Sequence, residues 1–232
     1  MSTLESTGTM SGPAEERHAF LKSTALWTVG GLVLAGAVGA FSTVAIAAPM
    51  SRAAGGWGGL IVVLGTFFFA HWVCRKMVYG SLKVPGFLLA CAAEGTALGF
   101  LLLSTLMRFG MKNGTSLVVE ALGITAATAG GMLVYAWFSK GELKLVGAFL
   151  SMAFIPMLIV MAVGVFFPMG GMLGILVSGV FVVVSAAGLL WRLNYAVQML
   201  GTDQHVEAAY EVTMGVLVLL WNIITLLNRL RR

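Results

Sequence analysis

Seven apolar segments, each about 20 residues long, follow one another along this chain. They cover residues 24–48, 56–74, 84–107, 116–138, 145–167, 171–191 and 209–228. Each can cross a hydrocarbon core of about 30 Å as an α-helix, because a helix rises about 1.5 Å per residue. The gaps between them hold charged residues, glycine or proline, which end apolar helices. The pattern predicts an all-α, polytopic membrane protein whose seven transmembrane helices form one bundle.

The composition excludes a mainly soluble protein. Of 232 residues, 59% are hydrophobic and 10% are charged, whereas soluble domains carry roughly 25% charged residues. The net charge of +5 is spread over short loops, so we expect a lipid bilayer as partner and no nucleic acid. Residues 1–22 are rich in Ser, Thr, Gly and Glu and predict a disordered cytoplasmic tail, and residues 23–232 form the membrane domain.

The distribution of Lys and Arg predicts the orientation. With a cytoplasmic N-terminus, eight basic residues of the tail and loops face the cytoplasm: Arg17, Lys22, Arg75, Lys76, Lys83, Lys140, Lys144 and Arg192. Three face the other side: Arg52, Arg108 and Lys112. This bias favours a cytoplasmic N-terminus, and the short loops favour a bacterial inner membrane. The C-terminal arginines run against the bias, so the last segment either spans fully or dips in and returns.

Small residues at four-residue spacing form three stripes within the predicted spans. The stripes are Gly31, Ala35 and Gly39; Gly95 and Gly99; and Gly123, Ala127 and Gly131. Such stripes let the backbones of membrane helices approach closely, so they predict a tightly packed bundle. The glycines form no phosphate-binding motif.

Glu94 lies at the centre of the third apolar segment. A carboxyl there costs a few kcal/mol or more unless it is neutralised, paired or hydrated. One interpretation is a proton- or cation-sensing group that faces the interior of the bundle. The other is a protonated acid that bonds a neighbouring helix for structural reasons.

Glu120 is the second candidate for ion or proton sensing. It lies in the first turn of the fourth segment, where the helix dipole alone favours a carboxylate. It also shares a face with Gly123, so we expect it to point into the packed interior. Glu211, which opens the seventh segment, is interpreted as a helix cap.

Polar residues gather at the end of the sixth segment and in the seventh. Arg192, Asn194 and Gln198 predict a polar cluster, in which Asn194 and Gln198 share a helix face. Asn222 is a lone amide in the seventh segment, and we expect it to bond another helix. His205, Asp203 and Glu207 lie in a predicted loop, where they could bind a metal weakly, although a solvated loop is favoured. No catalytic set can be recognised, so we expect no enzyme, no metal site and no cofactor.

Motifs in the second half of the chain resemble the Bax inhibitor-1 family. They are Val119–Thr128, Tyr135–Lys140, Val146–Met152, Gly164–Phe167 and Leu219–Leu230. The likeness runs from the first span to the end of the chain. It implies a seven-helix bundle with the last helix at its centre, and many members are described as pH-sensitive calcium leak pathways.

The chain departs from that family at a pair of aspartates. Ala196 stands where a Tyr-Asp-Thr-Gln motif has its aspartate, and Leu219 stands three residues before Asn222, where the second is expected. The chain therefore resembles a divergent bacterial member without this pair. The loss of the second aspartate is also like the bacterial branch that associates with a membrane-bound AAA protease.

Two functional hypotheses follow. The first is a pH-sensitive leak or exchange pathway for calcium or protons, in which Glu94 and Glu120 replace the missing aspartates. The second is a membrane adaptor that modulates a membrane-bound AAA protease or a stress response without conducting ions. Calcium prefers six to eight oxygen ligands, which two glutamates cannot supply, so proton sensing is favoured over a strong calcium site.

Overall fold

The computed structural model describes residues 14–138, 143, 146–147, 150, 152 and 171–231. The helices are α1 (Ala14–Ser42), η2 (Thr43–Ala47), α2 (Ala48–Phe68), η3 (Phe69–Cys74), α3 (Arg75–Val78), α4 (Lys83–Phe138), α6 (Gly171–Gln198) and α7 (His205–Leu230). Both η elements are π-helical turns within longer helices. These parts of the chain contain no strand, so the all-α prediction is confirmed for them.

Among the described residues, five helices are long and apolar enough to cross a membrane. They are Glu15–Ala53, Gly58–Val78, Lys83–Ala136, Gly171–Gln198 and His205–Leu230. The fifth predicted segment, residues 145–167, lies outside the described residues except at isolated positions. The count of seven spans therefore stays a prediction, whereas the polytopic helical architecture is confirmed.

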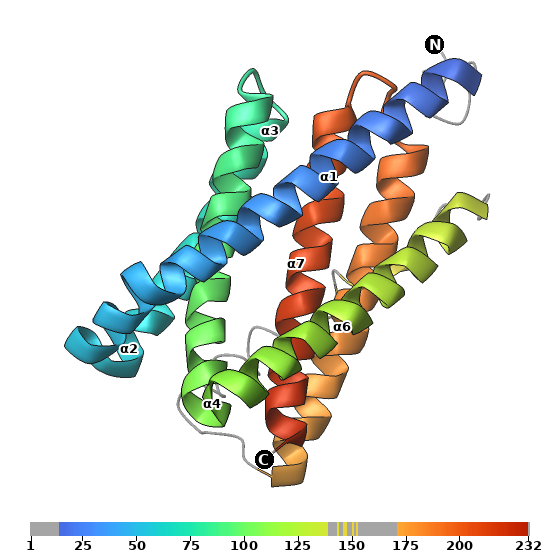
Figure 1. Cartoon of the computed structure of the whole chain (residues 1–232). Helices are drawn as coiled ribbons and strands as arrows, with labels where there is room; N and C mark the ends of the chain where they lie inside the picture. Colours follow the sequence, from blue (N-terminus) through green and yellow to red (C-terminus); the bar gives the residue numbers. More distant parts are fainter. Residues whose placement is uncertain are drawn as a thin grey trace.

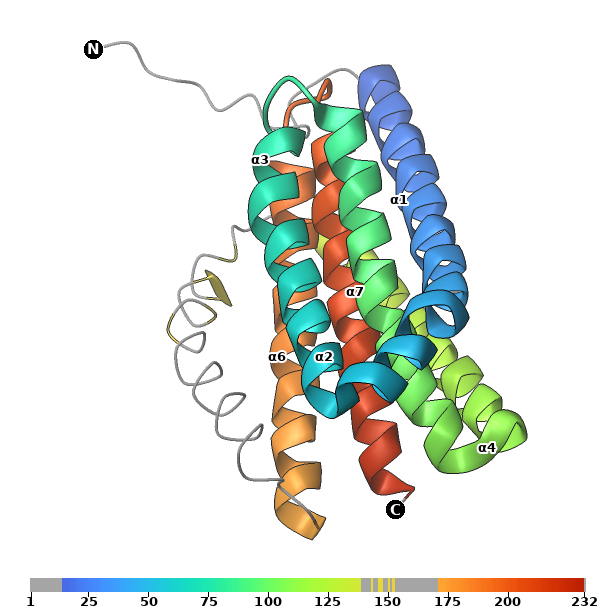
Figure 2. The same ribbon diagram turned by 90° about the vertical axis from the view of Figure 1, so that its left-hand side faces the viewer.

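Helix α4 consists of two arms that meet at Gly110. This residue has a φ of 76°, a left-handed conformation that glycine adopts without steric cost. The chain reverses direction there, so residues 83–109 run toward one end of the bundle and residues 111–138 run back (Figures 1 and 2). The gap predicted between the apolar segments 84–107 and 116–138 therefore narrows to Gly110, and Asn113 and Gly114 lie inside the second arm.

Helix α7 lies at the centre of the bundle, as the family resemblance implies. It contacts α1, α3, α4 and α6 (Figure 1). Its 26 residues extend about 39 Å, enough to span a bilayer. The end of α7 lies opposite the start of α1 (Figure 2). The last segment therefore crosses the bundle completely, and the alternative in which it dips in and returns is wrong.

The start of α1 belongs to the folded bundle. Helix α1 begins at Ala14, so residues 14–22 are helical, contrary to the predicted disordered tail. Phe20 is buried against Leu200 and Ala208, at the α6–α7 loop. We call this end of the bundle the loop end, and the opposite end, where the chain terminates, the C-terminal end.

Two of the three small-residue stripes pack α1 against α4. A Cβ atom on Gly95 would lie 2.5 Å from the carbonyl oxygen of Ala35, and one on Gly39 would lie 3.2 Å from that of Gly95. The third stripe behaves differently, because a Cβ atom on Gly123 or Gly131 would meet nothing within 4 Å. The prediction of close packing is confirmed for the first two stripes and is wrong for the third among the described residues.

Candidate functional site

A π-helical turn brings the helix α2–η3–α3 against the central helix. The turn, η3, covers Phe69–Cys74, and π turns of this kind occur often at functional sites. The hydroxyl of Tyr210 on α7 donates a hydrogen bond to the carbonyl oxygen of Ala70, at 2.9 Å. Because Tyr210 is fully buried, this bond fixes the position of η3 and of the next residue, His71.

His71 meets Glu94 in the interior of the bundle. Nδ1 of His71 lies 3.2 Å from Oε1 of Glu94 and also 3.2 Å from the carbonyl oxygen of Phe67. The contact with Glu94 has the distance of an ion pair but not the geometry of a hydrogen bond, and Oε1 has no hydrogen-bond partner. A single hydrogen on Nδ1 therefore has two oxygen acceptors within reach. The Phe67 ring stacks on the imidazole at 4.2 Å and holds it in this place.

Glu94 is buried at mid-depth. Glu94 is 5% exposed. It lies about 16 Å along α4 from Lys83, near the middle of the first arm. Its helical neighbours Ala90, Cys91, Ala97 and Leu98 are all buried as well. The prediction that Glu94 faces the bundle interior is confirmed, and His71 is the partner that sequence reasoning did not assign to it.

Two further carboxylates, Glu207 and Glu211, are buried on α7 at the loop end. They are four residues apart and only 2% and 1% exposed. Oε1 of Glu207 lies 2.6 Å from Nζ of Lys83 at the start of α4. The interpretations of Glu207 as a loop residue and of Glu211 as a cap are both wrong. The signal that could have found the pair was their four-residue spacing on one face of an apolar helix.

Glu211 is surrounded by three donors from three segments. Arg192 of α6 donates to Oε2 at 2.8 Å, and the Tyr79 hydroxyl donates to Oε1 at 3.0 Å. Arg75 of α3 lies 3.3 Å from Oε1. Tyr79 lies in the turn between α3 and α4. Its burial, and then the negative charge of Glu211, raise the pKa of its hydroxyl, so it stays a donor.

The polar cluster predicted at the end of α6 is divided. Arg192 reaches Glu211, whereas the side-chain oxygen of Asn194 accepts a hydrogen bond from the backbone N–H of Leu143 at 3.3 Å. Residues two apart on a helix point in nearly opposite directions, so Arg192 and Asn194 do not share one site. Gln198 is the last residue of α6 and is half-buried.

The amide that bonds across helices is Asn228 and not Asn222. Asn222 donates to the carbonyl oxygen of Val218 in its own helix, so the expectation for it is wrong. Asn228 donates to Oγ1 of Thr105 on α4 at 2.8 Å. This bond is buried near the C-terminal end of the bundle and ties α7 to the first arm of α4.

Glu120 does not point into the interior. It is exposed on the second arm of α4 and pairs with Arg231 at the C-terminal end. The expectation of an interior position is wrong, since the face that it shares with Gly123 is itself exposed. Glu94 and Glu120 thus have separate partners. Within the described ranges, no three His, Cys, Asp or Glu side chains gather in a way that could hold a metal ion.

Among the described residues, the buried carboxylates and their basic partners occupy the half of the bundle interior nearer the loop end. From Lys83 and Glu207 at the loop end they continue through Glu211 to Glu94 at mid-depth. Between Glu94 and the buried Thr105–Asn228 pair, the two facing helices bury large apolar side chains. These are Leu98 of α4, and Leu219, Leu220, Ile223 and Ile224 of α7. We call these five residues the apolar layer. It separates Glu94 from the Thr105–Asn228 pair.

The positions of the two expected aspartates are apolar and buried. Ala196 packs with Phe20, Leu200 and Ala208 at the loop end, whereas Leu219 belongs to the main core and to the apolar layer. The buried carboxylates of the described residues are instead Glu94, Glu207 and Glu211.

Comparison with known proteins agrees with this architecture. The sequence model of a family described as inhibitor of apoptosis-promoting Bax1 matches residues 17–232, nearly the whole chain. No curated protein sequence matches the chain. The match begins within the first turn of α1 and extends over all later helices, including the central α7. The chain belongs to the Bax inhibitor-1 family and is an integral membrane protein of the Bax inhibitor type.

Proposed function

We propose that this protein is a pH-sensitive pathway for protons or cations, with Glu94 as its titrating group. One observation carries the proposal. Glu94 is buried at mid-depth, and its Oε1 has no hydrogen bond although His71 lies 3.2 Å away. A charged carboxylate in such a place is costly. Its protonation state therefore determines which packing of α4 against η3 is stable.

His71 is the group through which a proton reaches Glu94. Its side chain keeps 19% of its surface exposed, against 6% for that of Glu94, so it is the more accessible member of the pair. When both ring nitrogens carry hydrogen, Nδ1 can pass its proton to the Glu94 carboxylate, and a neutral imidazole with its hydrogen on Nε2 remains.

The oxygen count favours protons over calcium. Calcium takes about six to eight oxygen ligands, and Glu94 brings two. Glu120 pairs with Arg231, while Glu207 and Glu211 are already occupied by Lys83, Arg75 and Arg192. A proton needs one acceptor, and Glu94 is sufficient for it.

The apolar layer corresponds to a closed state. An ion that reached Glu94 from the loop end would meet Leu219 and Ile223 before the C-terminal end. Conduction therefore requires a second arrangement of α7 against α4. A change of charge at Glu94, whose neighbour Leu98 belongs to the layer, favours that rearrangement.

The proposed orientation places the loop end in the cytoplasm of a bacterial cell. The α3–α4 turn, the start of α1 and the end of α6 lie at this end and carry Arg17, Lys22, Lys76 and Arg192. Basic residues are enriched on the cytoplasmic side of membrane proteins. Tagging each terminus for accessibility in intact cells tests the orientation.

The experiment is a flux assay in proteoliposomes. Vesicles with the purified protein and protein-free vesicles are loaded with a pH dye or a calcium dye and compared between about pH 5 and 8. The proposal predicts proton flux that changes with pH and exceeds any calcium flux. Flux equal to that of protein-free vesicles at every pH would refute it.

The apolar layer also favours the second candidate, a non-conducting adaptor of a membrane-bound protease. In that case the layer never opens, and the charged loop end is a structural and docking surface. Co-purification with a membrane protease, together with absence of flux, would support the adaptor.

A further inference from the structure

The basic residues around the α3–α4 turn differ in how their charges are neutralised. Arg75 contacts Glu211, and Lys83 contacts Glu207, so both are paired with buried carboxylates of α7. Lys76 has no carboxylate partner among the described residues. Its Nζ atom lies over the ring of Trp72, 5.0 Å from the centroid. The cation–π contact holds the ammonium group in place without neutralising its charge.

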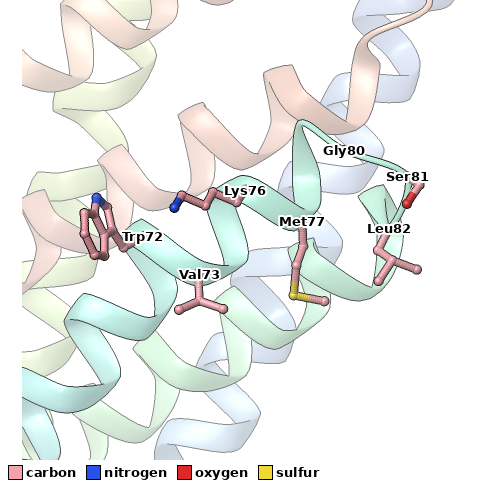
Figure 3. A pocket seen from close by; sticks show the side chains of 7 residues that line it. All are labelled: Trp72, Val73, Lys76, Met77, Gly80, Ser81 and Leu82. Carbon is pink, nitrogen blue, oxygen red and sulfur yellow. The ribbon is translucent and has the colours of Figure 1, made fainter.

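A hollow of about 330 Å³ lies beside Lys76 on the outer side of α3 (Figure 3). Val73, Met77 and Leu82 give it an apolar wall. Lys76 and Ser81 line it with an ammonium group and a hydroxyl. Its volume is at the lower end of the roughly 300–1,000 Å³ typical of ligand sites, which suits a small polar headgroup better than a large organic ligand.

The hollow lies at the level of a membrane interface. The candidate span Gly58–Val78 ends beside it. Trp72 is 71% exposed and Val73 46% exposed, although both belong to this membrane-crossing segment. Tryptophan concentrates where lipid headgroups meet hydrocarbon. The surface around Trp72 and Val73 is therefore one that acyl chains cover.

We propose that this hollow binds one anionic phospholipid. The lipid phosphate pairs with Nζ of Lys76, at the Trp72 end of the hollow (Figure 3). The acyl chains run along Trp72 and Val73. Charge complementarity selects the ligand, since Lys76 is the basic residue of this turn that no acidic side chain of the described ranges neutralises. The site faces the lipid and is separate from the interior carboxylates, so it does not depend on conduction.

Native mass spectrometry of the full chain tests the proposal. The protein is mixed in detergent with increasing concentrations of phosphatidylglycerol, and the number of lipids that it retains after release from the detergent is measured. Wild type should retain one lipid in a saturable manner and retain phosphatidylcholine less well. Lys76→Gln should weaken retention about fivefold, the effect of one basic residue near an anionic lipid. The matched control is Lys22→Gln, which removes one exposed charge at the same end of the bundle and should leave binding unchanged.

Three results would overturn the proposal. Equal losses in Lys76→Gln and Lys22→Gln would show a general effect of surface charge. Equal retention of phosphatidylcholine would show ordinary lipid contact. Displacement of the lipid by inorganic phosphate at matched concentration would show a site for free phosphate.

A second measurement locates the bound lipid. Brominated phosphatidylglycerol in nanodiscs should quench more of the tryptophan fluorescence in wild type than in Trp72→Phe. Equal quenching in the two proteins would refute the assignment to this hollow, even if Lys76→Gln binds lipid weakly.

Discussion

Oε1 of Glu94 lies 3.2 Å from Nδ1 of His71, and each belongs to a different helix of the bundle. The position of η3 brings the two residues together. The hydroxyl of Tyr210 on α7 donates a hydrogen bond to the carbonyl oxygen of Ala70, the residue before His71, and so fixes that position. The central helix thus positions a histidine against a buried acid that has no hydrogen bond at this oxygen. This relationship underlies the proposed function, and the surrounding packing gives four further predictions.

Glu211→Gln should destabilise the protein by about 3 kcal/mol, because two arginines lose the carboxylate between them in a buried place. Glu120→Gln is the matched control. Its pair with Arg231 is exposed, with 43% and 40% of the two side chains accessible, so a change below about 1 kcal/mol is expected. Unfolding in detergent measures both, and similar losses would contradict the assignment of Glu211 as a structural centre.

Gly95→Ala should destabilise the α1–α4 contact by about 1–3 kcal/mol, the usual cost of overpacking. The new methyl group would lie 2.5 Å from the carbonyl oxygen of Ala35, which cannot move without shifting α1. Gly123→Ala makes the same change where nothing lies within 4 Å and should cause no loss. Thermal unfolding compares the two variants, and equal stability would argue against the close helix approach.

Asn228→Ala should lose about 1 kcal/mol, in line with hydrogen bonds between membrane helices. Asn222→Ala should be nearly neutral, since within the described parts of the chain its amide bonds the carbonyl of Val218 in its own helix. A double-mutant cycle of Asn228→Ala with Thr105→Ala isolates the bond between the helices. A coupling energy of zero would mean that this bond contributes nothing.

Tyr79 gives the stability a dependence on alkaline pH. Burial raises the pKa of its hydroxyl, so above about pH 10 the folded protein keeps a proton that the unfolded chain loses. The stabilising effect of this hydroxyl is complete below that pH and falls as the pH rises. Wild type should therefore lose stability with alkaline pH more steeply than Tyr79→Phe. Parallel pH profiles of the two proteins would rule out this contribution.

The apolar pattern predicted most of the fold. Runs of about 20 apolar residues can be satisfied in a bilayer only by helices, so the helices and their order follow from the sequence. The ends of the helices did not follow. The turn of α4 occurs at Gly110, because one residue with positive φ is enough to reverse the chain, whereas Asn113 and Gly114 are accommodated within the helix.

The site was only partly predictable. Glu94 was found because a carboxyl at the centre of an apolar run is costly wherever the run packs. His71 could not be assigned to it, since their contact depends on a π turn and on the packing of two helices. Glu211 was interpreted as a cap because the burial of a residue near a helix start depends on what lies beside it, here Arg192 and Tyr79. Glu120 shows the reverse error, since its face is exposed.

Proton flux through proteoliposomes that contain Glu94→Gln tests the central claim most directly. Glutamine keeps the shape of the side chain but cannot take up or release a proton. The proposal predicts that the pH dependence of flux disappears in Glu94→Gln and is retained in Glu120→Gln, whose carboxylate is exposed and paired with Arg231. A Glu94→Gln protein that is folded in the membrane and shows the wild-type pH profile would contradict the assignment of Glu94 as the titrating group.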